Sequence, residues 1–336
     1  MKAFEYITAE NFEAATRLLA EARNDGLRVK AGGIDVLDRL KERLEEPKAV
    51  LNLRRLPPEA SEIEVRSGDE QIIIGALATV AQVGAHEAIR VHLPALAEAA
   101  SHAATPQIRN VATVGGNLCQ KPRCWYYRSH DFPCLKKGGA TCYAVHGDNR
   151  YHAVFGAGAC HIVHPSNLAV PLLAYGAQLR LVRYDNGKVA QRVVALDDFY
   201  RVPANPQHDE HVLEPGELIE AVLVPLAAVG PRSAYHEVRE KQSFDWPLVS
   251  CAVNWNVAAQ PRIVLGAVAP IPWRLKEVEK LVGDKTLTDE LVEAARSAAQ
   301  RGAEPMSGNG YKVALVGALV EQTLRAADAA KREGGW

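Results

Sequence analysis

The spacing of apolar residues predicts that the chain begins as a small α/β unit. A short strand precedes a helix over 10–24, whose apolar residues fall on one helical face. The following elements are a strand over 27–31, a helix from Asp35 to Pro47 and a strand over 50–53. The charged, proline-containing segment 54–62 then marks a boundary. We therefore expect a first unit that covers residues 1–57.

Strands dominate the next part of the chain. Alternating apolar residues from position 62, interrupted by Ser-Gly-Asp, predict a hairpin. Helices are expected over 79–90, 93–104 and 167–175, and strands over 178–184, 188–194 and 218–224. These elements predict a second unit over residues 58–228.

The last hundred residues predict a separate α/β domain over 229–336. Its expected strands cover 234–240, 248–256 and 262–268, and its expected helices cover 274–283, 287–301 and 309–331. For the chain as a whole we expect the α+β class.

Composition excludes some partners. The 336 residues carry a net charge of −1, which gives no electrostatic reason to expect binding to nucleic acid or a membrane surface. The longest apolar runs are far shorter than the roughly 20 residues of a membrane span, so no membrane span is expected. The N-terminus lacks the pattern of an export signal, which predicts a cytoplasmic protein, or a periplasmic one if a partner subunit carries the signal.

Two Gly-Gly turns are candidate ligand-binding loops. Gly32-Gly33 lies between a predicted strand and a predicted helix, where free backbone amides can bind a pyrophosphate. A purely structural turn is the alternative, and the segment lacks the G-x-G-x-x-G pattern of ordinary dinucleotide-binding folds. The second turn, in ATVGGN over 112–117, adds a threonine and an asparagine that could bond a polar ligand.

Five of the six cysteines lie between residues 119 and 160. Disulfides are disfavoured because no export signal is seen and five is an odd number. Zinc sites usually contain close Cys-x2-4-Cys pairs, whereas the gaps that follow Cys124 are nine, seven and seventeen residues. An iron–sulfur cluster tolerates long loops between its four thiolates. The spacing favours a cluster, with zinc or simple buried thiols as the alternatives.

Four motifs occur in a family-specific order: AGG (31–33), QIRNVATVGGN (107–117), HPSNLA (164–169) and GELIEAVLVP (216–225). The chain resembles the FAD-binding subunits of molybdenum hydroxylases, the group of xanthine dehydrogenase, aldehyde oxidoreductase and carbon monoxide dehydrogenase. This resemblance implies a two-part FAD-binding domain of the vanillyl-alcohol-oxidase/PCMH type, followed by the C-terminal domain. The cysteine-rich insertion at about 119–160 is most similar to that of the bacterial periplasmic-type aldehyde oxidoreductase flavoprotein subunit, which carries an extra [4Fe-4S] cluster.

The resemblance also implies a set of site residues. Expected FAD contacts are Ala31, Gly32, Gly33, Ile34, Asp35, Val36, Leu37, Thr113, Gly116, Asn117, Asn167, Ile219 and Glu237. Expected cluster ligands are Cys124, Cys134, Cys142 and Cys160, with Cys119 as a spare thiol and reserve ligand. The sequence departs from the family pattern at three of these positions. Ile34 replaces a threonine, Asn167 an aspartate and Glu237 a lysine.

The implied function is electron transfer without a catalytic acid, base or nucleophile in this chain. FAD would receive electrons from [2Fe-2S] clusters of a small partner, and these electrons would originate at a molybdenum cofactor in a large partner. The cluster would pass them to a ferredoxin-like or quinone-like external acceptor. The cysteine spacing favours an aldehyde oxidoreductase, with a xanthine or aromatic-substrate dehydrogenase as the alternative. Two further alternatives are a zinc-stabilised, non-enzymatic assembly protein on the same fold and a stand-alone flavin oxidase.

Overall fold

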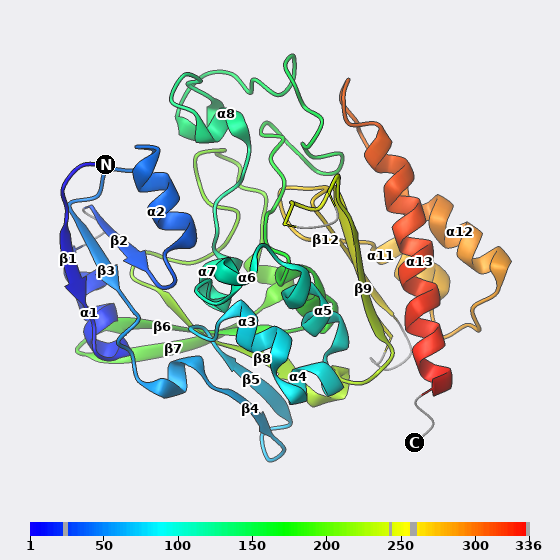
Figure 1. The fold of residues 1–336 in the computed structure, drawn as a ribbon, viewed down its shortest axis with the longest axis horizontal. Coiled ribbons are helices and arrows are strands. Elements are labelled where there is room, and N and C mark those ends of the chain that lie inside the picture. Colours follow the sequence, from blue (N-terminus) through cyan, green and yellow to red (C-terminus); the bar gives the residue numbers. More distant parts are fainter. Residues whose placement is uncertain (23–25, 242–243, 256–260, 334–336) are drawn as a thin grey trace.

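The computed structural model describes residues 1–22, 26–241, 244–255 and 261–333. Its first unit is a parallel sheet in the order β1-β3-β2 (Figure 1). The elements are β1 (Glu5–Thr8), α1 (Phe12–Ala22), β2 (Leu27–Lys30), α2 (Ile34–Lys41) and β3 (Ala49–Asn52). The central strand β3 is the most apolar of the three, and its Val50 and Leu51 are fully buried between the helices.

The middle of the chain forms an antiparallel sheet in the order β4-β5-β8-β6-β7. Its strands are β4 (Ile63–Arg66), β5 (Gln71–Gly75), β6 (Gln178–Asp185), β7 (Lys188–Ala195) and β8 (Leu218–Pro225). Side chains alternate between the faces of β5, so that Ile72 and Ile74 enter the main core while Ile73 joins a small cluster with Leu223 on the other face. The helices of this region are α3 (Val80–Ala85), α4 (Glu87–His92), α5 (Pro94–His102), α6 (Pro106–Arg109), α7 (Val114–Leu118), α9 (Ala169–Ala174) and α10 (Leu196–Phe199).

The C-terminal sheet is antiparallel in the order β12-β11-β10-β9. Its strands are β9 (Ser233–Val238), β10 (Val249–Asn254), β11 (Arg262–Gly266) and β12 (Trp273–Arg274). The helices α11 (Lys276–Val282), α12 (Asp289–Ala299) and α13 (Tyr311–Glu333) cover one face of this sheet. Cys251, the one cysteine outside the insertion, is fully buried in this core. Among the described residues, no helix has the length and apolar character needed to cross a membrane.

Two predicted helices differ from the structure, and the end of a third cannot be compared with it. The helix expected over 79–90 is two helices, because His86 has an extended backbone between α3 and α4. The helix expected to reach Pro47 ends at Lys41, since Arg43 adopts a positive φ of 55°. The helix expected over 10–24 is observed up to Ala22, and its expected end lies outside the described residues.

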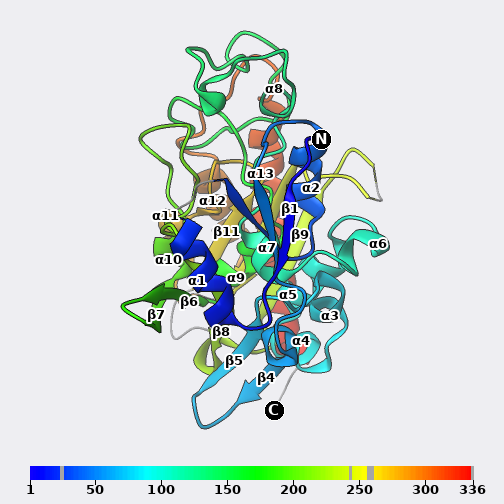
Figure 2. The ribbon, with the colours of Figure 1, turned by 90° about the vertical axis from the view of Figure 1, so that its left-hand side faces the viewer.

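The cysteine-rich segment 119–160 contains little regular structure. It includes only the short helix α8 (Trp125–Arg128) and a 3-10 turn over Leu135–Lys137. The part that carries α8 lies at one edge of the molecule above α2, as Figures 1 and 2 show from two directions. Long-range contacts therefore have to hold this segment in place.

Candidate functional site

A cavity of about 840 Å³ lies where the first unit, the middle sheet and the start of the cysteine-rich segment meet. This size is within the range of ordinary cofactor pockets. Eleven of the thirteen predicted FAD contacts line it: Ala31, Gly32, Gly33, Ile34, Asp35, Val36, Thr113, Gly116, Asn117, Asn167 and Ile219. Leu37 instead packs beside Val36 and Leu40, and Glu237 lies outside the lining. We call this cavity the large cleft.

The first glycine turn is held against the second by close backbone packing. A Cβ atom on Gly32 would lie 2.1 Å from the carbonyl oxygen of Val111. Gly33, which precedes α2, has a φ of 89°, a left-handed conformation that glycine adopts without strain. The turn therefore requires glycine at both positions, and both glycines line the cleft.

The second turn uses part of its polar groups internally. Thr113 is the N-cap of α7, and its hydroxyl accepts a hydrogen bond from the Gly116 amide at 3.3 Å. Asn117 accepts a hydrogen bond from the Ser166 hydroxyl at 2.6 Å, and the same hydroxyl accepts one from the Ala169 amide. Because Thr113 is buried in this role, its side chain organises the turn.

The two outer positions that depart from the family pattern, 167 and 237, are in contact with each other. The Asn167 amide donates to the Glu237 carboxylate at 3.3 Å. The same carboxylate accepts a hydrogen bond from the Tyr235 hydroxyl at 2.7 Å and pairs with Arg239. Glu237 thus holds the side chain of Asn167 from behind the cleft.

Cationic side chains line the large cleft, and most are already paired with carboxylates. Arg28 and Arg39 both pair with Glu45, and Lys121 pairs with Asp209. Arg109 differs, because it donates to the carbonyl oxygens of Ala103 and Ala104, at 2.9 and 2.8 Å, and no carboxylate of a described residue pairs with it. Its charge is therefore available to an anionic ligand in the cleft. Sequence reasoning missed Arg109, although it lies in the QIRNVATVGGN run.

The side chain of Asp35, a predicted FAD contact, is bound by residues of the cysteine-rich segment. Its carboxylate accepts hydrogen bonds from Arg128 at 2.8 Å and from the Lys121 amide at 3.1 Å, and it pairs with Arg123 at 3.0 Å. Arg128 also pairs with Asp38 at 2.8 Å. The Asp35 side chain thus forms part of the cleft wall and joins α2 to the cysteine-rich segment.

The four predicted cluster ligands line a second, small cavity, which we call the cysteine cavity. Cys124, Cys134, Cys142 and Cys160 share it with three tyrosines and two histidines, His152 and His161. No histidine was among the predicted site residues, yet His152 Nε2 lies 3.2 Å from Cys124 Sγ. The cysteine cavity measures about 10 Å³. Among the described residues, no group of three or more His, Cys, Asp or Glu side chains is arranged to hold a single metal ion.

Burial affects the ionisation of two of these thiols, Cys124 and Cys160. It raises the pKa of Cys124 to about 11 and that of Cys160 to about 12, so both are neutral thiols near pH 7. Cys119 lies apart from them on the lining of the large cleft, and burial raises its pKa to about 12. The structure therefore separates the spare cysteine from the other four.

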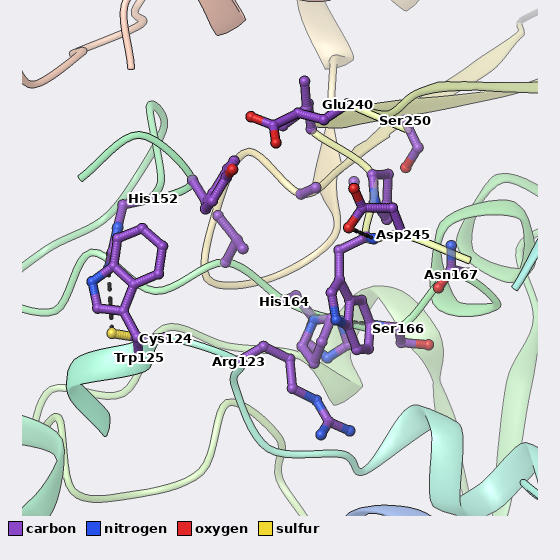
Figure 3. A pocket seen from close by; sticks show the side chains of 18 residues that line it. Arg123, Cys124, Trp125, His152, His164, Ser166, Asn167, Glu240, Asp245 and Ser250 are labelled. Carbon is purple, nitrogen blue, oxygen red and sulfur yellow. Dashed lines mark hydrogen bonds between the residues drawn. The ribbon is translucent and has the colours of Figure 1, made fainter. Parts of the chain in front are cut away.

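A third cavity, of about 160 Å³, adjoins the other two through shared lining residues, and Figure 3 shows its lining from close by. It shares Arg123, Asn167, Asp245 and Trp246 with the large cleft, and Cys124 and His152 with the cysteine cavity. Indole and imidazole rings make much of its lining: Trp125, Trp246, His152 and His164. We call it the aromatic cavity.

Aromatic rings also enclose the cysteine cavity. Tyr126 contacts Phe132 edge-to-face with ring centroids 5.0 Å apart, and Phe132 contacts Tyr143 at 5.2 Å. Trp125 packs edge-to-face on His152 at 5.6 Å. The stretch that follows Cys124 therefore packs around the thiols, while Arg128 at its end reaches α2.

Comparisons with known proteins agree with this arrangement. Residues 2–227 match the FAD binding domain in molybdopterin dehydrogenase, and residues 233–327 match the CO dehydrogenase flavoprotein C-terminal domain. The chain is 34% identical to the aldehyde oxidoreductase FAD-binding subunit PaoB of Escherichia coli K12, over 89% of this chain and 93% of that protein. It is 27% identical to the carbon monoxide dehydrogenase medium chain of Hydrogenophaga pseudoflava, over 96% of each.

Solved structures share the fold. A chain of the Cu,Mo-CO dehydrogenase superposes with a TM-score of 0.75 at 21% identity, covering 98% of this chain and 99% of that one. A chain of quinoline 2-oxidoreductase from Pseudomonas putida 86 gives a TM-score of 0.73 at 21% identity, with 98% and 99% covered. The expected fold, with an FAD-binding part followed by a C-terminal domain, is confirmed. Together with the two family matches, the likeness shows that this chain belongs to the FAD-binding flavoprotein subunits of molybdenum hydroxylases.

Proposed function

We propose that this chain binds one FAD in the large cleft and one [4Fe-4S] cluster on Cys124, Cys134, Cys142 and Cys160. In this proposal it passes electrons from a partner subunit to an external acceptor. The observation that carries the proposal is the arrangement of three adjoining cavities, in which the aromatic cavity shares lining residues with both the cleft and the cysteines.

The residues of the large cleft suit FAD. The first glycine turn offers backbone amides at the start of α2, where a pyrophosphate is favoured by the exposed N–H groups. Arg109 supplies a positive charge for the same anion, and Ile219 supplies an apolar surface for an aromatic ring. Leu37 and Glu237 do not line the cleft in this proposal. Leu37 packs beside Val36, and Glu237 holds the side chain of Asn167.

The donor set of the cysteine cavity suits an iron–sulfur cluster. Four sulfur atoms from widely spaced positions meet there, which is the ligand set of a [4Fe-4S] centre. The small volume means that the segment has to expand around a cluster, and the thiols have to lose their protons on binding. Cys119 is the reserve ligand, but its place on the cleft lining makes it the natural control.

FAD in the large cleft would supply a centre that can take up two electrons one at a time, which suits a position between one-electron iron–sulfur clusters. The chain's part is to hold the two cofactors apart by a fixed distance, with aromatic residues that exclude water between them. The rings of Trp125 and Trp246 on the aromatic cavity support that role.

The partners are proposed from the family resemblance. We place this chain beside a small subunit with [2Fe-2S] clusters and a large subunit with a molybdenum cofactor, with a ferredoxin-like or quinone-like acceptor outside the complex. The 34% identity to an aldehyde oxidoreductase subunit favours aldehydes as the substrates of the complex. We also propose units of residues 1–57, 58–228 and 229–336, because each contains one of the three sheets.

An anaerobic absorption spectrum of the purified chain, with iron, zinc and FAD assayed on the same sample, tests the proposal. We expect flavin bands above a broad absorption near roughly 400 nm that bleaches with dithionite, and about four irons per FAD. Cys134→Ser should remove the iron and leave the flavin, whereas Cys119→Ser should keep both. Zinc in place of iron, or iron loss in the Cys119 variant instead, would contradict the assignment of the cluster; absence of flavin would contradict that of the cleft.

A further inference from the structure

Asp35 lies where the first glycine turn meets the cysteine-rich segment, and four donors converge on its carboxylate. Arg128 and Arg123 approach one oxygen at 2.8 and 3.0 Å. The Lys121 amide and Arg39 approach the other oxygen at 3.1 and 3.2 Å. Three of the four donors belong to the cysteine-rich segment. One carboxylate thus joins two regions that lie some ninety residues apart in the chain.

The surroundings keep this carboxylate ionised. Burial alone would raise the pKa of Asp35, but the charges of Arg123, Arg39 and Arg128 outweigh burial and hold it below its usual value. The Asp35 side chain is 13% exposed and that of Arg128 is 12% exposed, so solvent screens their interaction little. Separating the two would leave charges partly buried and unpaired, which is unfavourable.

On one side, the network is tied to a proposed cluster ligand. Arg123 directly precedes Cys124, which is the N-cap of α8, and Arg128 is the last residue of that helix. The Arg128 guanidinium also donates to the carbonyl oxygens of Pro122 and Lys121, at 2.8 and 3.0 Å. The position of Cys124 therefore sets where both guanidinium groups lie.

On the other side, the network is tied to the proposed FAD site. Asp35 is the second residue of α2 and lies two positions after Gly33. Asp35 lines the large cleft together with Gly32, Gly33 and Arg123. Any shift of the carboxylate moves the helix start whose amides face the cleft.

We infer that Asp35 is a positioning residue that couples the two cofactor sites, so that each cofactor binds more tightly when the other is present. The inference rests on the proposed function and adds to it an energetic link through the Asp35 carboxylate. Asp38 also pairs with Arg128, but its side chain is 46% exposed, so solvent screens that pair more strongly. Coupling between sites is reciprocal, and couplings of this kind typically change affinity by roughly 5- to 150-fold. The chemistry that transmits it is charge pairing across the α2–α8 contact, without a change of fold.

The experiment compares FAD affinity with and without the cluster in the full chain. FAD is titrated into flavin-free wild-type protein that retains its iron, and into the iron-free Cys134→Ser variant, by quenching of flavin fluorescence. The backbone hydrogen bonds of Cys134 are to Phe132, Lys137 and Gly139, so the substitution removes a proposed cluster ligand without deleting a group of the network. We expect FAD to bind at least about fivefold more weakly to Cys134→Ser. In the Asp35→Asn background this ratio should fall to about one.

Glu45→Gln is the matched control. Glu45 also lines the large cleft and also pairs with Arg39, but both of its cationic partners, Arg28 and Arg39, belong to the first unit. This variant should keep the wild-type ratio. Arg128→Gln cuts the link from the cluster side and should abolish the ratio as Asp35→Asn does, which keeps the test valid if one variant fails to fold.

A second readout follows from reciprocity. Saturating FAD should slow the loss of iron to a chelator in wild-type protein and should not do so in Asp35→Asn. Equal FAD affinity of wild-type and Cys134→Ser proteins would overturn the inference, as would a ratio that persists in both Asp35→Asn and Arg128→Gln. Wild-type protein without FAD or without iron would instead refute the proposed function, so the two failures are distinguishable.

Discussion

Replacing Gly32 by alanine should disrupt the large cleft through backbone crowding alone. The added Cβ would lie 2.1 Å from the Val111 carbonyl oxygen, 3.0 Å from its carbon and 3.2 Å from Ala112 Cα. Real Cβ contacts essentially never fall below 3.0 Å, so the two glycine turns have to separate by about 1 Å. All three obstructing atoms belong to the backbone, and no side-chain rotation can relieve the contact.

Overpacking of this kind typically costs about 1–3 kcal/mol of stability. Because the strained turn lines the cleft, we expect the loss to appear in FAD binding as well. A loss of about 1.4 kcal/mol of binding free energy corresponds to a tenfold larger dissociation constant. Urea unfolding of the flavin-free chain and titration with FAD measure the two effects on the same preparation.

Gly68→Ala is the matched control, since no atom lies within 4 Å of the position its Cβ would occupy. This variant should match the wild type in FAD affinity and should change stability by less than about 1 kcal/mol. Wild-type stability and FAD affinity in Gly32→Ala would refute the reasoning, because they would mean that the two turns are not packed as the structure has them.

Three further predictions concern buried polar groups and the insertion. Burial lowers the pKa of Lys312 from 10.5 to about 7, so between these pH values the folded chain has lost a proton that the unfolded chain keeps. The free energy of unfolding, measured in urea relative to Lys312→Met, should therefore rise between pH 7 and 10.5 by up to about 1.4 kcal/mol per pH unit, and parallel pH dependences of the two proteins would contradict this. Lys136→Met should lower the free energy of unfolding by about 3–5 kcal/mol, because it leaves the buried Glu210 carboxylate without its cation. Adding Glu210→Gln should recover part of this loss, and a double variant whose loss is the simple sum of the two single losses would argue against the pair. Gly139→Ala would place a Cβ 1.7 Å from a backbone carbonyl oxygen of the cysteine-rich segment. The iron content of this variant should therefore fall while its FAD content stays the same, and an unchanged iron content would contradict the geometry of that loop.

Local patterns were sufficient to predict most of the secondary structure. Apart from the two-residue strand β12, which was expected to be the start of a helix, the strands of all three sheets and the C-terminal helices follow from periods of two and 3.6 residues, which each segment carries in its own side chains. The errors lie where single residues decide the backbone, as at His86 between α3 and α4 and at Arg43 after α2. Such conformations depend on packing around one position, so periodicity does not reveal them.

The candidate site divides in a similar way. The glycine turns and the clustering of cysteines are properties of short stretches, and the motifs that carry the family resemblance could be read from them directly. Thr113 was singled out from its motif, but its role as the N-cap of α7 emerges only from the folded turn. Arg109 was missed because its lack of a carboxylate partner depends on where the other charged residues of the described chain lie.

The sequence by itself determined the kinds of element, the two glycine turns, the number of thiols and the family. Tertiary structure alone decided which groups meet. It separates Cys119 from the four cysteines of the small cavity, pairs Asn167 with Glu237 and brings Arg128 to Asp35, 93 positions earlier. The physical reason is that charges pair, and residues share a cavity, only when they are close in space. Residues that are far apart in the chain become close only when the long loops between them close on folding, and no local repeat in the sequence encodes this.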